Sequence, residues 1–367
     1  ILRCLVGSEM CIRDRVSTGM LATRKLVENK NGYAGALTEA ELTKIVVQYK
    51  AVMAQSQEEQ DENYGTLYQP IDDILNFMIS VLTPDAGYDE TVLDSVTEDS
   101  VQDFYTWYRG NMKWMADQYG KTPEQKDYLE KKYSEIILPL QYESYGAWDT
   151  MIMYAETYSI VLAILVGFIC AGIFADDFQT KADAVFFASK YGRSKAIKNK
   201  ILAGVVATTM IYWTGIVLLS AISFGIMGTS GMHTPYQMSE AYSIYIMTYG
   251  QYYALTVACG YIASLLAASL AMLVAAKMHT ISVAVCIPFF LYCLLPFIGR
   301  VLSSYTKVFN LIPTILTNVE ASVRVPLLYQ IGTHVIRQVP LVMVMYTVLS
   351  IVLLPLIYRS FRRYGRA

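Results

Sequence analysis

The sequence has few charged residues and very few residues suited to acid–base or metal chemistry. Only 16% of its 367 residues are Asp, Glu, Lys or Arg, whereas soluble domains average about 25%. Its three histidines, His233, His279 and His334, are far apart and form no HExxH or Cys/His pattern. We therefore predict no metal site and no catalytic constellation, and the chain is not expected to be an enzyme.

A phosphate loop is also missing. Gly120, Lys121 and Thr122 spell GKT, but a phosphate loop needs a glycine five residues before the first of these, and that position is Met115. Pro123 follows directly. Because a phosphate cradle requires the whole glycine-rich turn, we expect this chain to bind no nucleotide and no other cofactor.

Cysteine is absent from residues 17–150, so this region is not a disulfide scaffold. Outside residues 1–16, the cysteines lie in apolar segments, where small packing residues are expected. These cysteines are Cys170, Cys259, Cys286 and Cys293.

What the sequence does have is long apolar segments. Hydrophobic residues make up 54% of the chain, and five stretches approach the roughly 20 apolar residues that a membrane-spanning helix needs. The sequence therefore predicts an all-α polytopic membrane protein with five visible transmembrane helices and the lipid bilayer as its surroundings. The predicted spans are about 157–175, 201–228, 252–276, 280–299 and 338–358.

Charge divides the chain into two parts. Residues 17–150 carry 11 basic and 23 acidic residues, whereas residues 151–367 carry 15 basic and 6 acidic residues. The first part has helical signals, among them capping spacing at Thr38 and Glu41 and an N-cap, N1 proline and N3 partner at Thr122, Pro123 and Gln125. No run alternates convincingly as a strand does. We predict an acidic helical domain at 17–150 and a transmembrane domain at 151–367.

The segment between the first two spans, residues 176–200 and called the basic loop below, predicts the orientation. It holds six Lys or Arg and three Asp, and short basic loops stay on the cytoplasmic side. Counting spans from this loop places residues 17–150 outside and the C-terminus in the cytoplasm. The expected location is the bacterial cell membrane.

The N-terminus does not fit this topology. Residues 1–16 contain no apolar run long enough to span, yet a domain placed outside must have been translocated. This segment resembles translated sequencing-adapter sequence. We expect residues 1–16 to be non-native and a first transmembrane helix, the sixth of the full product, to be lost before the helical domain.

The basic loop itself predicts a short amphipathic helix from about Thr180 to Tyr191, with Gly192 suited to its end and Ser194 able to cap the helix that follows. Two interpretations stay open from these residues alone. The helix could anchor the protein to anionic lipid, or it could dock a cytoplasmic subunit.

The stretch FADDFQTKADAVFFASKYGRSKAIKNKILAG, residues 174–204, resembles the permease subunits of type-2 ABC exporters. The resemblance implies six spans, a coupling helix in the first cytoplasmic loop after the outside domain, and a pair of partly embedded helices at about 308–330. It also implies a cytoplasmic ATPase subunit that supplies ATP and Mg²⁺, a second permease copy or paralogue, and no nucleic acid. The residues implied at the ATPase contact are Asp177, Phe178, Val185, Phe186, Lys190, Tyr191, Gly192, Arg193 and Lys195.

Two charges and one stripe of small residues are further candidates. Glu156 and Arg300 lie at the expected outer ends of spans, where they could serve a pathway or interface or simply reach headgroup water. Gly260, Ser264 and Ala268 repeat every four residues, which allows close helix packing within one bundle or between two copies.

The sequence thus predicts an ABC exporter permease. The alternative is a membrane-anchored sensor or assembly factor whose outside domain binds a ligand or partner. An ion-driven carrier is less favoured, because no charge lies deep within a span.

Overall fold

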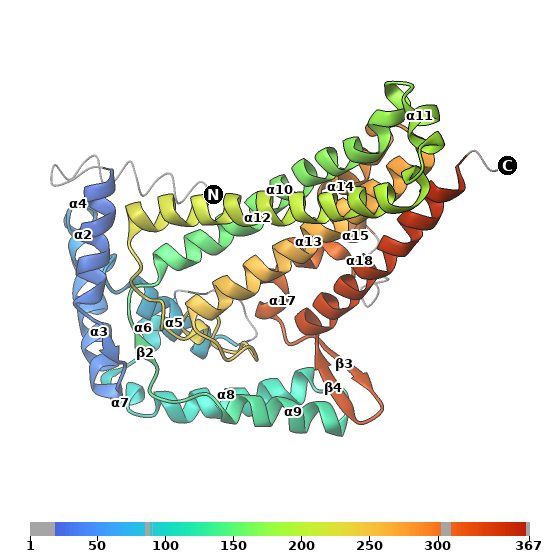
Figure 1. The fold of residues 1–367 in the computed structure, drawn as a ribbon. Coiled ribbons are helices and arrows are strands. Elements are labelled where there is room, and N and C mark those ends of the chain that lie inside the picture. The colour runs from blue at the N-terminus through green and yellow to red at the C-terminus, as the bar shows by residue number, and fades with distance from the viewer. Residues whose placement is uncertain (1–18, 85–88, 90, 302–309, 365–367) are drawn as a thin grey trace.

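A computed structural model describes residues 19–84, 89, 91–301 and 310–364. Figure 1 shows a helical domain at one end of a bundle of long helices. Residues 1–16, and the first span expected before the domain, lie outside the described residues.

Each of the five apolar segments forms a helix long and apolar enough to cross a membrane. This confirms the prediction of an all-α, multi-pass membrane protein, although the helix ends differ from the predicted bounds. They are α10 (Gly146–Gln179), α12 (Ile197–Met227), α13 (Tyr249–Met278), α14 (Ile281–Phe289) continued by a π-helical turn (Phe290–Leu294) into α15 (Leu295–Val301), and α18 (Gln338–Arg363).

Helix α13 lies at the centre of the bundle. Of its most apolar 18-residue window, 61% is buried inside the protein, compared with 17% for the span that begins at Ile281. The exposed surface of the outer helices is apolar, as lipid contact requires. The bundle is therefore organised around α13, with α10 and α18 packed against it.

Residues 20–145 form the helical domain, called so from here on. Its core contains Phe77, whose ring lies edge-on to those of Phe104 and Tyr108, with centroids 5.7 Å apart in both pairs. Its helices are α2 (Met20–Asn31), α3 (Glu39–Met53), α4 (Gln57–Asn63), a π-helical turn (Tyr64–Tyr68), α5 (Asp72–Leu82), α6 (Val92–Ser95), α7 (Glu98–Val101), α8 (Phe104–Tyr119) and α9 (Pro123–Ser134).

The predicted helix starts in this domain are confirmed. The Thr38 hydroxyl accepts a hydrogen bond from the backbone N–H of Glu41, and Thr122 does the same for Gln125 with Pro123 at the first helical position. The GKT tripeptide therefore begins a helix.

Two short antiparallel strand pairs accompany the helices in the described residues. Strand β1 (Gly35–Ala36) pairs with β2 (Gln141–Tyr142), and β3 (Leu328–Ile331) forms an antiparallel hairpin with β4 (His334–Arg337). Strands of two to four residues are too short to show a convincing alternation in the sequence.

The pair of partly embedded helices expected at about 308–330 is not found in the described part of that stretch. It contains a 3-10 helix (Pro313–Thr317), the five-residue α17 (Glu320–Arg324) and strand β3. Pro326 lies between α17 and the strand, and proline cannot continue a helix there because it lacks the N–H donor.

Candidate functional site

The basic loop lies at the end of the bundle opposite the helical domain (Figure 1). Its helix, α11 (Asp183–Ala188), is shorter than the predicted Thr180 to Tyr191. Lys181 adopts a left-handed conformation with φ of 56°, and Ser189 is extended, so the helix cannot continue in either direction.

Gly192 and Ser194 have roles different from those predicted. Gly192 begins the π-helical turn Gly192–Ala196 that leads into α12, and a Cβ atom there would overlap the carbonyl oxygen of Phe186. Ser194 does not cap α12, because its hydroxyl donates to the Tyr191 carbonyl within that turn. Glycine is thus required at 192 by the close approach of two backbone segments.

An ion pair fixes the two ends of the basic loop to each other. Lys200 Nζ lies 2.7 Å from Asp177 Oδ2, and it also donates to the carbonyl of Ile173 at 2.6 Å. Both charged side chains are only 20% exposed. Such a partly buried pair with an additional hydrogen bond holds the end of α10 against the start of α12.

Aromatic rings from three parts of the chain pack beneath α11. Phe361 of α18 contacts Phe178, Phe186 and Phe187, with ring centroids 5.2 to 5.9 Å apart. His279, at the end of α13, lies 3.9 Å from the Phe178 ring. The basic loop therefore rests on α10, α13 and α18 through a shared aromatic cluster.

Arg193 points inward to the same cluster. Its Nη1 donates to the backbone carbonyls of Arg362 at 3.1 Å and Tyr364 at 2.6 Å, and its guanidinium lies 4.7 Å from the centroid of the Phe187 ring. A cation at the last carbonyls of a helix is favourable, because those groups have no partner within the helix. Arg193 thus ties the basic loop to the end of α18.

The opposite side of the basic loop is uncovered. Val185 is 76% exposed and Tyr191 is 50% exposed. The ammonium groups of Lys190 and Lys195 lie 5.5 and 5.0 Å from the Tyr191 ring centroid, so each makes a cation–π contact with this ring. We call these four residues the exposed loop face.

The structure thus divides the nine residues implied at an ATPase contact. The exposed loop face holds four of them. Asp177, Phe178, Gly192 and Arg193 are engaged within the chain, and Phe186 is half-buried between the two groups.

Glu156 contacts the segment that precedes the hairpin. It is 9% exposed, and its Oε1 accepts the backbone N–H groups of Val319 and Glu320 at 2.7 and 2.9 Å. The side chain therefore holds the start of α17 and does not extend to headgroup water. Arg300 lies in α15, and its side chain is outside the described part of the structure.

The small-residue stripe packs inside the bundle. Gly260, Ser264 and Ala268 are buried along α13, and a Cβ at Gly260 would overlap the hydroxyls of Ser159 on α10 and Tyr212 on α12. Of the two open interpretations, the structure supports packing within one chain. This contact brings three helices together at one point.

A cluster of ion pairs around Arg324, near the helical domain, was not foreseen. Arg324 of α17 forms ion pairs with Glu240, which lies between α12 and α13, and with Glu320. Burial raises the pKa of Glu240, although the nearby Arg324 opposes the shift. No motif signals these contacts, because Glu240 and Arg324 are distant in the sequence.

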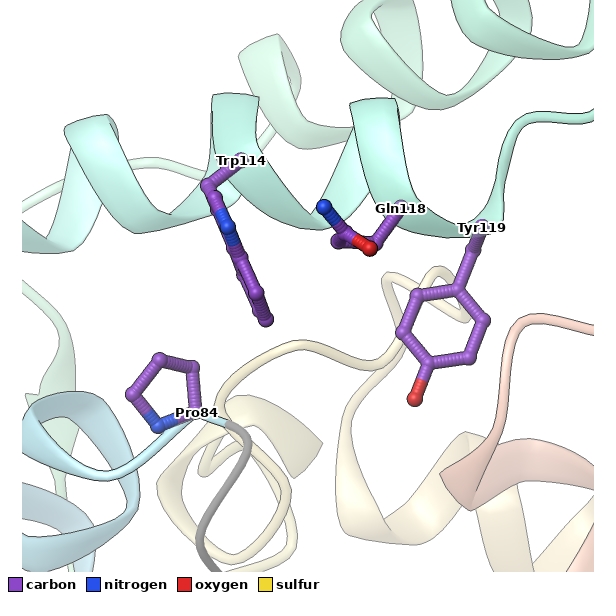
Figure 2. A pocket seen from close by; sticks show the side chains of 4 residues that line it. All are labelled: Pro84, Trp114, Gln118 and Tyr119. Carbon is purple, nitrogen blue, oxygen red and sulfur yellow. The ribbon is translucent and has the colours of Figure 1, made fainter.

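The helical domain contains a pocket of about 330 Å³ between α8 and Pro84, which lies just after the end of α5. Figure 2 shows Trp114 extending from α8 toward Pro84 and Tyr119 extending from the same helix further along, with the Gln118 amide between the two rings. No sequence motif indicates this pocket, although three of its four described lining residues lie within one and a half turns of α8.

Within the described residues, no group of three or more His, Cys, Asp or Glu side chains could hold a metal ion. The cysteines described are free. Comparisons of the chain with family models, with curated proteins and with solved structures find no match.

Proposed function

We propose that this chain is the membrane permease subunit of an ATP-driven ABC exporter. In this proposal, residues 20–145 lie outside the cell, and both the basic loop and the C-terminus lie in the cytoplasm. A separate cytoplasmic ATPase subunit binds ATP and Mg²⁺, and a second permease copy or paralogue completes the pathway.

The observation that carries the proposal is the two-sided construction of the basic loop. Its inner side is fixed to α10, α12 and α18 by the Asp177–Lys200 pair, the Phe361 cluster and Arg193. Its outer side offers the exposed loop face, which combines an apolar residue, an aromatic ring and two cations. A loop that only anchored to lipid would not need such extensive fixation to three helices.

The division of residues suggests how force would pass through the loop. The exposed loop face would contact the ATPase subunit, with Val185 as the apolar anchor. Asp177, Phe178, Gly192 and Arg193 would transmit movement, because they hold the loop rigidly on the spanning helices. Phe186 would take part both in the contact with the ATPase subunit and in the transmission of movement. Motion of the ATPase would then tilt α10 and α12 together, since Lys200 and Asp177 join their ends.

The test is a charge substitution on the exposed loop face. Val185→Glu should reduce recovery of the ATPase subunit with the affinity-purified full chain roughly tenfold or more, because a desolvated, unpaired carboxylate is costly in an interface. Mass spectrometry would identify the subunit by its complete phosphate loop. Membrane insertion and the unfolding temperature should not change.

Ile137→Glu provides the matched control. Ile137 is 83% exposed and lies in the helical domain, so the same substitution there should leave ATPase recovery unchanged. Recovery of no phosphate-loop protein with the wild-type chain, or equal recovery from the Val185 variant and wild type, would contradict the proposal.

A second candidate, the membrane-anchored sensor or assembly factor, is favoured by the pocket in the helical domain. A sensor would co-purify with a partner that has no phosphate loop, and the same purification distinguishes the two functions.

A further inference from the structure

The pocket beneath α8 is lined by residues whose polar groups are unused. The structure has no hydrogen-bond partner for the Trp114 indole N–H, the Gln118 amide or the Tyr119 hydroxyl within the described part of the chain. Trp114 and Tyr119 are 36% and 40% exposed. Three polar side chains thus line one open pocket, and no partner for them is found among the described residues.

The two rings are also unpaired as aromatic surfaces. Trp148 and Trp213, both in the bundle, each pack against neighbouring aromatic rings. Trp114 and Tyr119 stack on no other ring among the described residues. Partly exposed tryptophan and tyrosine side chains are enriched at binding interfaces, because each combines an apolar ring with a polar group.

We propose that this pocket binds a neutral saccharide. A pyranose ring has apolar C–H faces that pack on aromatic rings, and a rim of hydroxyl groups that both donate and accept hydrogen bonds. The pocket matches both properties, because the rings flank an amide (Figure 2). Its volume of about 330 Å³ is at the lower end of the range of roughly 300–1,000 Å³ for ligand pockets, which suits one or two sugar rings.

The lining residues argue against other ligand classes. None of the lining residues that the structure describes is charged, so these side chains offer no ion-pair partner to an ionic ligand. A proline-rich peptide would fit the aromatic walls, but its proline residues have no N–H to give to the Gln118 carbonyl, whereas a sugar hydroxyl can donate to it. A lipid tail would leave all three polar groups unpaired.

The site goes beyond the proposed transport function and does not depend on it. Tyr119 ends α8, and three residues later Thr122 donates a hydrogen bond to Gln330 of the β3–β4 hairpin at 2.7 Å. The saccharide would therefore bind next to the contact that joins the helical domain to α18.

The experiment measures binding of chitobiose, cellobiose and maltose to the full chain in lipid nanodiscs. Nanodiscs are chosen because common maltoside detergents carry a sugar headgroup that would occupy the site. We expect saturation-transfer NMR to detect at least one of these disaccharides at concentrations up to about 10 mM, which is sufficient for a weak site.

Variants then place the binding in the pocket. Trp114→Ala should weaken binding roughly tenfold or more, since buried aromatic anchors dominate small interfaces. Gln118→Leu should weaken binding as well, because leucine has a similar size but lacks the amide that would form hydrogen bonds with the sugar hydroxyl groups. Trp107→Ala is the matched control: Trp107 is a similarly exposed tryptophan on α8 that does not line the pocket, so affinity should stay within about twofold.

Three results would overturn the proposal. These are no binding of any of the three sugars, equal losses in the Trp107 and Trp114 variants, or binding of a polyproline peptide that Trp114→Ala abolishes while no sugar binds. If Trp114→Ala lowers the unfolding temperature, the Gln118 variant decides the outcome. A failure of the ATPase co-purification would leave these binding results unaffected, so the two proposals fail separately.

Discussion

Glu156 offers a direct test of how the segment before the hairpin is held in place. Its carboxylate accepts two backbone N–H groups, those of Val319 and Glu320, at 2.7 and 2.9 Å in a buried position. Glu156→Ala removes the acceptor for both. Each buried N–H left without a partner costs about 1–3 kcal/mol, so the local stability of α17 should fall by about 2–6 kcal/mol.

Glu156→Gln separates charge from geometry. The amide oxygen can still accept from both N–H groups, and only the charge assistance is lost, which we place at about 1 kcal/mol in total. Because 1.4 kcal/mol corresponds to a factor of about ten, hydrogen exchange in this segment should accelerate about fivefold in the Gln variant and at least about 30-fold in the Ala variant.

The assay is hydrogen–deuterium exchange with mass spectrometry on peptides that cover residues 316–324 of the full chain in nanodiscs. Ser159→Ala is the control, because Ser159 is buried on the same helix but pairs with Tyr212 and not with this segment. Unchanged exchange in the Glu156→Ala variant would refute the reasoning. The reasoning would also be refuted if exchange accelerated no more in the Glu156→Ala variant than in the Glu156→Gln variant.

Three further substitutions test the backbone approach at the basic loop and the ion-pair cluster around Arg324. Gly192→Ala should cost about 3 kcal/mol, because the added methyl group meets the Phe186 carbonyl and not a flexible side chain, whereas Gly110→Ala in α8 should stabilise by about 0.5–1 kcal/mol, since its surroundings are open. Thermal unfolding of both variants measures the two opposite signs, and equal shifts would contradict the geometry. The raised pKa of Glu240 means that its stabilising effect is fully present below its usual pKa of 4.5 and is lost as the pH rises through the raised value, despite the pairing with Arg324. Glu240→Gln should therefore flatten the loss of thermal stability above pH 4.5, and an unchanged pH profile would show that this carboxyl group is not responsible.

The parts of the fold predicted from the sequence are those that local residues determine. An uncharged run such as 157–175 can only be a helix in lipid, because its backbone polar groups must be satisfied within the segment. The helix starts at Thr38 and Thr122 depend on hydrogen bonds that span three residues. Such features leave a signal within one turn of the chain.

The candidate sites depend instead on residues far apart in the sequence. Glu156 and Val319 are separated by 163 positions, and Arg193 and Tyr364 by 171. The sequence identified Glu156 and Arg193 as notable but could not supply their partners. For Arg193, the consequence is specific: a residue expected to face a partner subunit is used to hold the basic loop on α18.

Helix α18 connects the two ends of the molecule. It follows directly after β4, whose hairpin is held on α9 by Gln330, and its start is further held by a hydrogen bond from the Val339 N–H to the Tyr245 hydroxyl at 3.2 Å. Its other end carries Phe361, beneath the basic loop.

A helix of 26 residues is about 39 Å long at 1.5 Å per residue, and its hydrogen-bonded turns resist compression, with one bond of the ladder missing at Pro355. A shift of the hairpin relative to α9 would therefore move Phe361 and the carbonyl groups that bind Arg193. This provides a physical route by which a ligand in the helical domain could change the position of the exposed loop face. The route requires both the Thr122–Gln330 contact and the Arg193 contact, so the loss of either one should uncouple the two ends without unfolding the bundle.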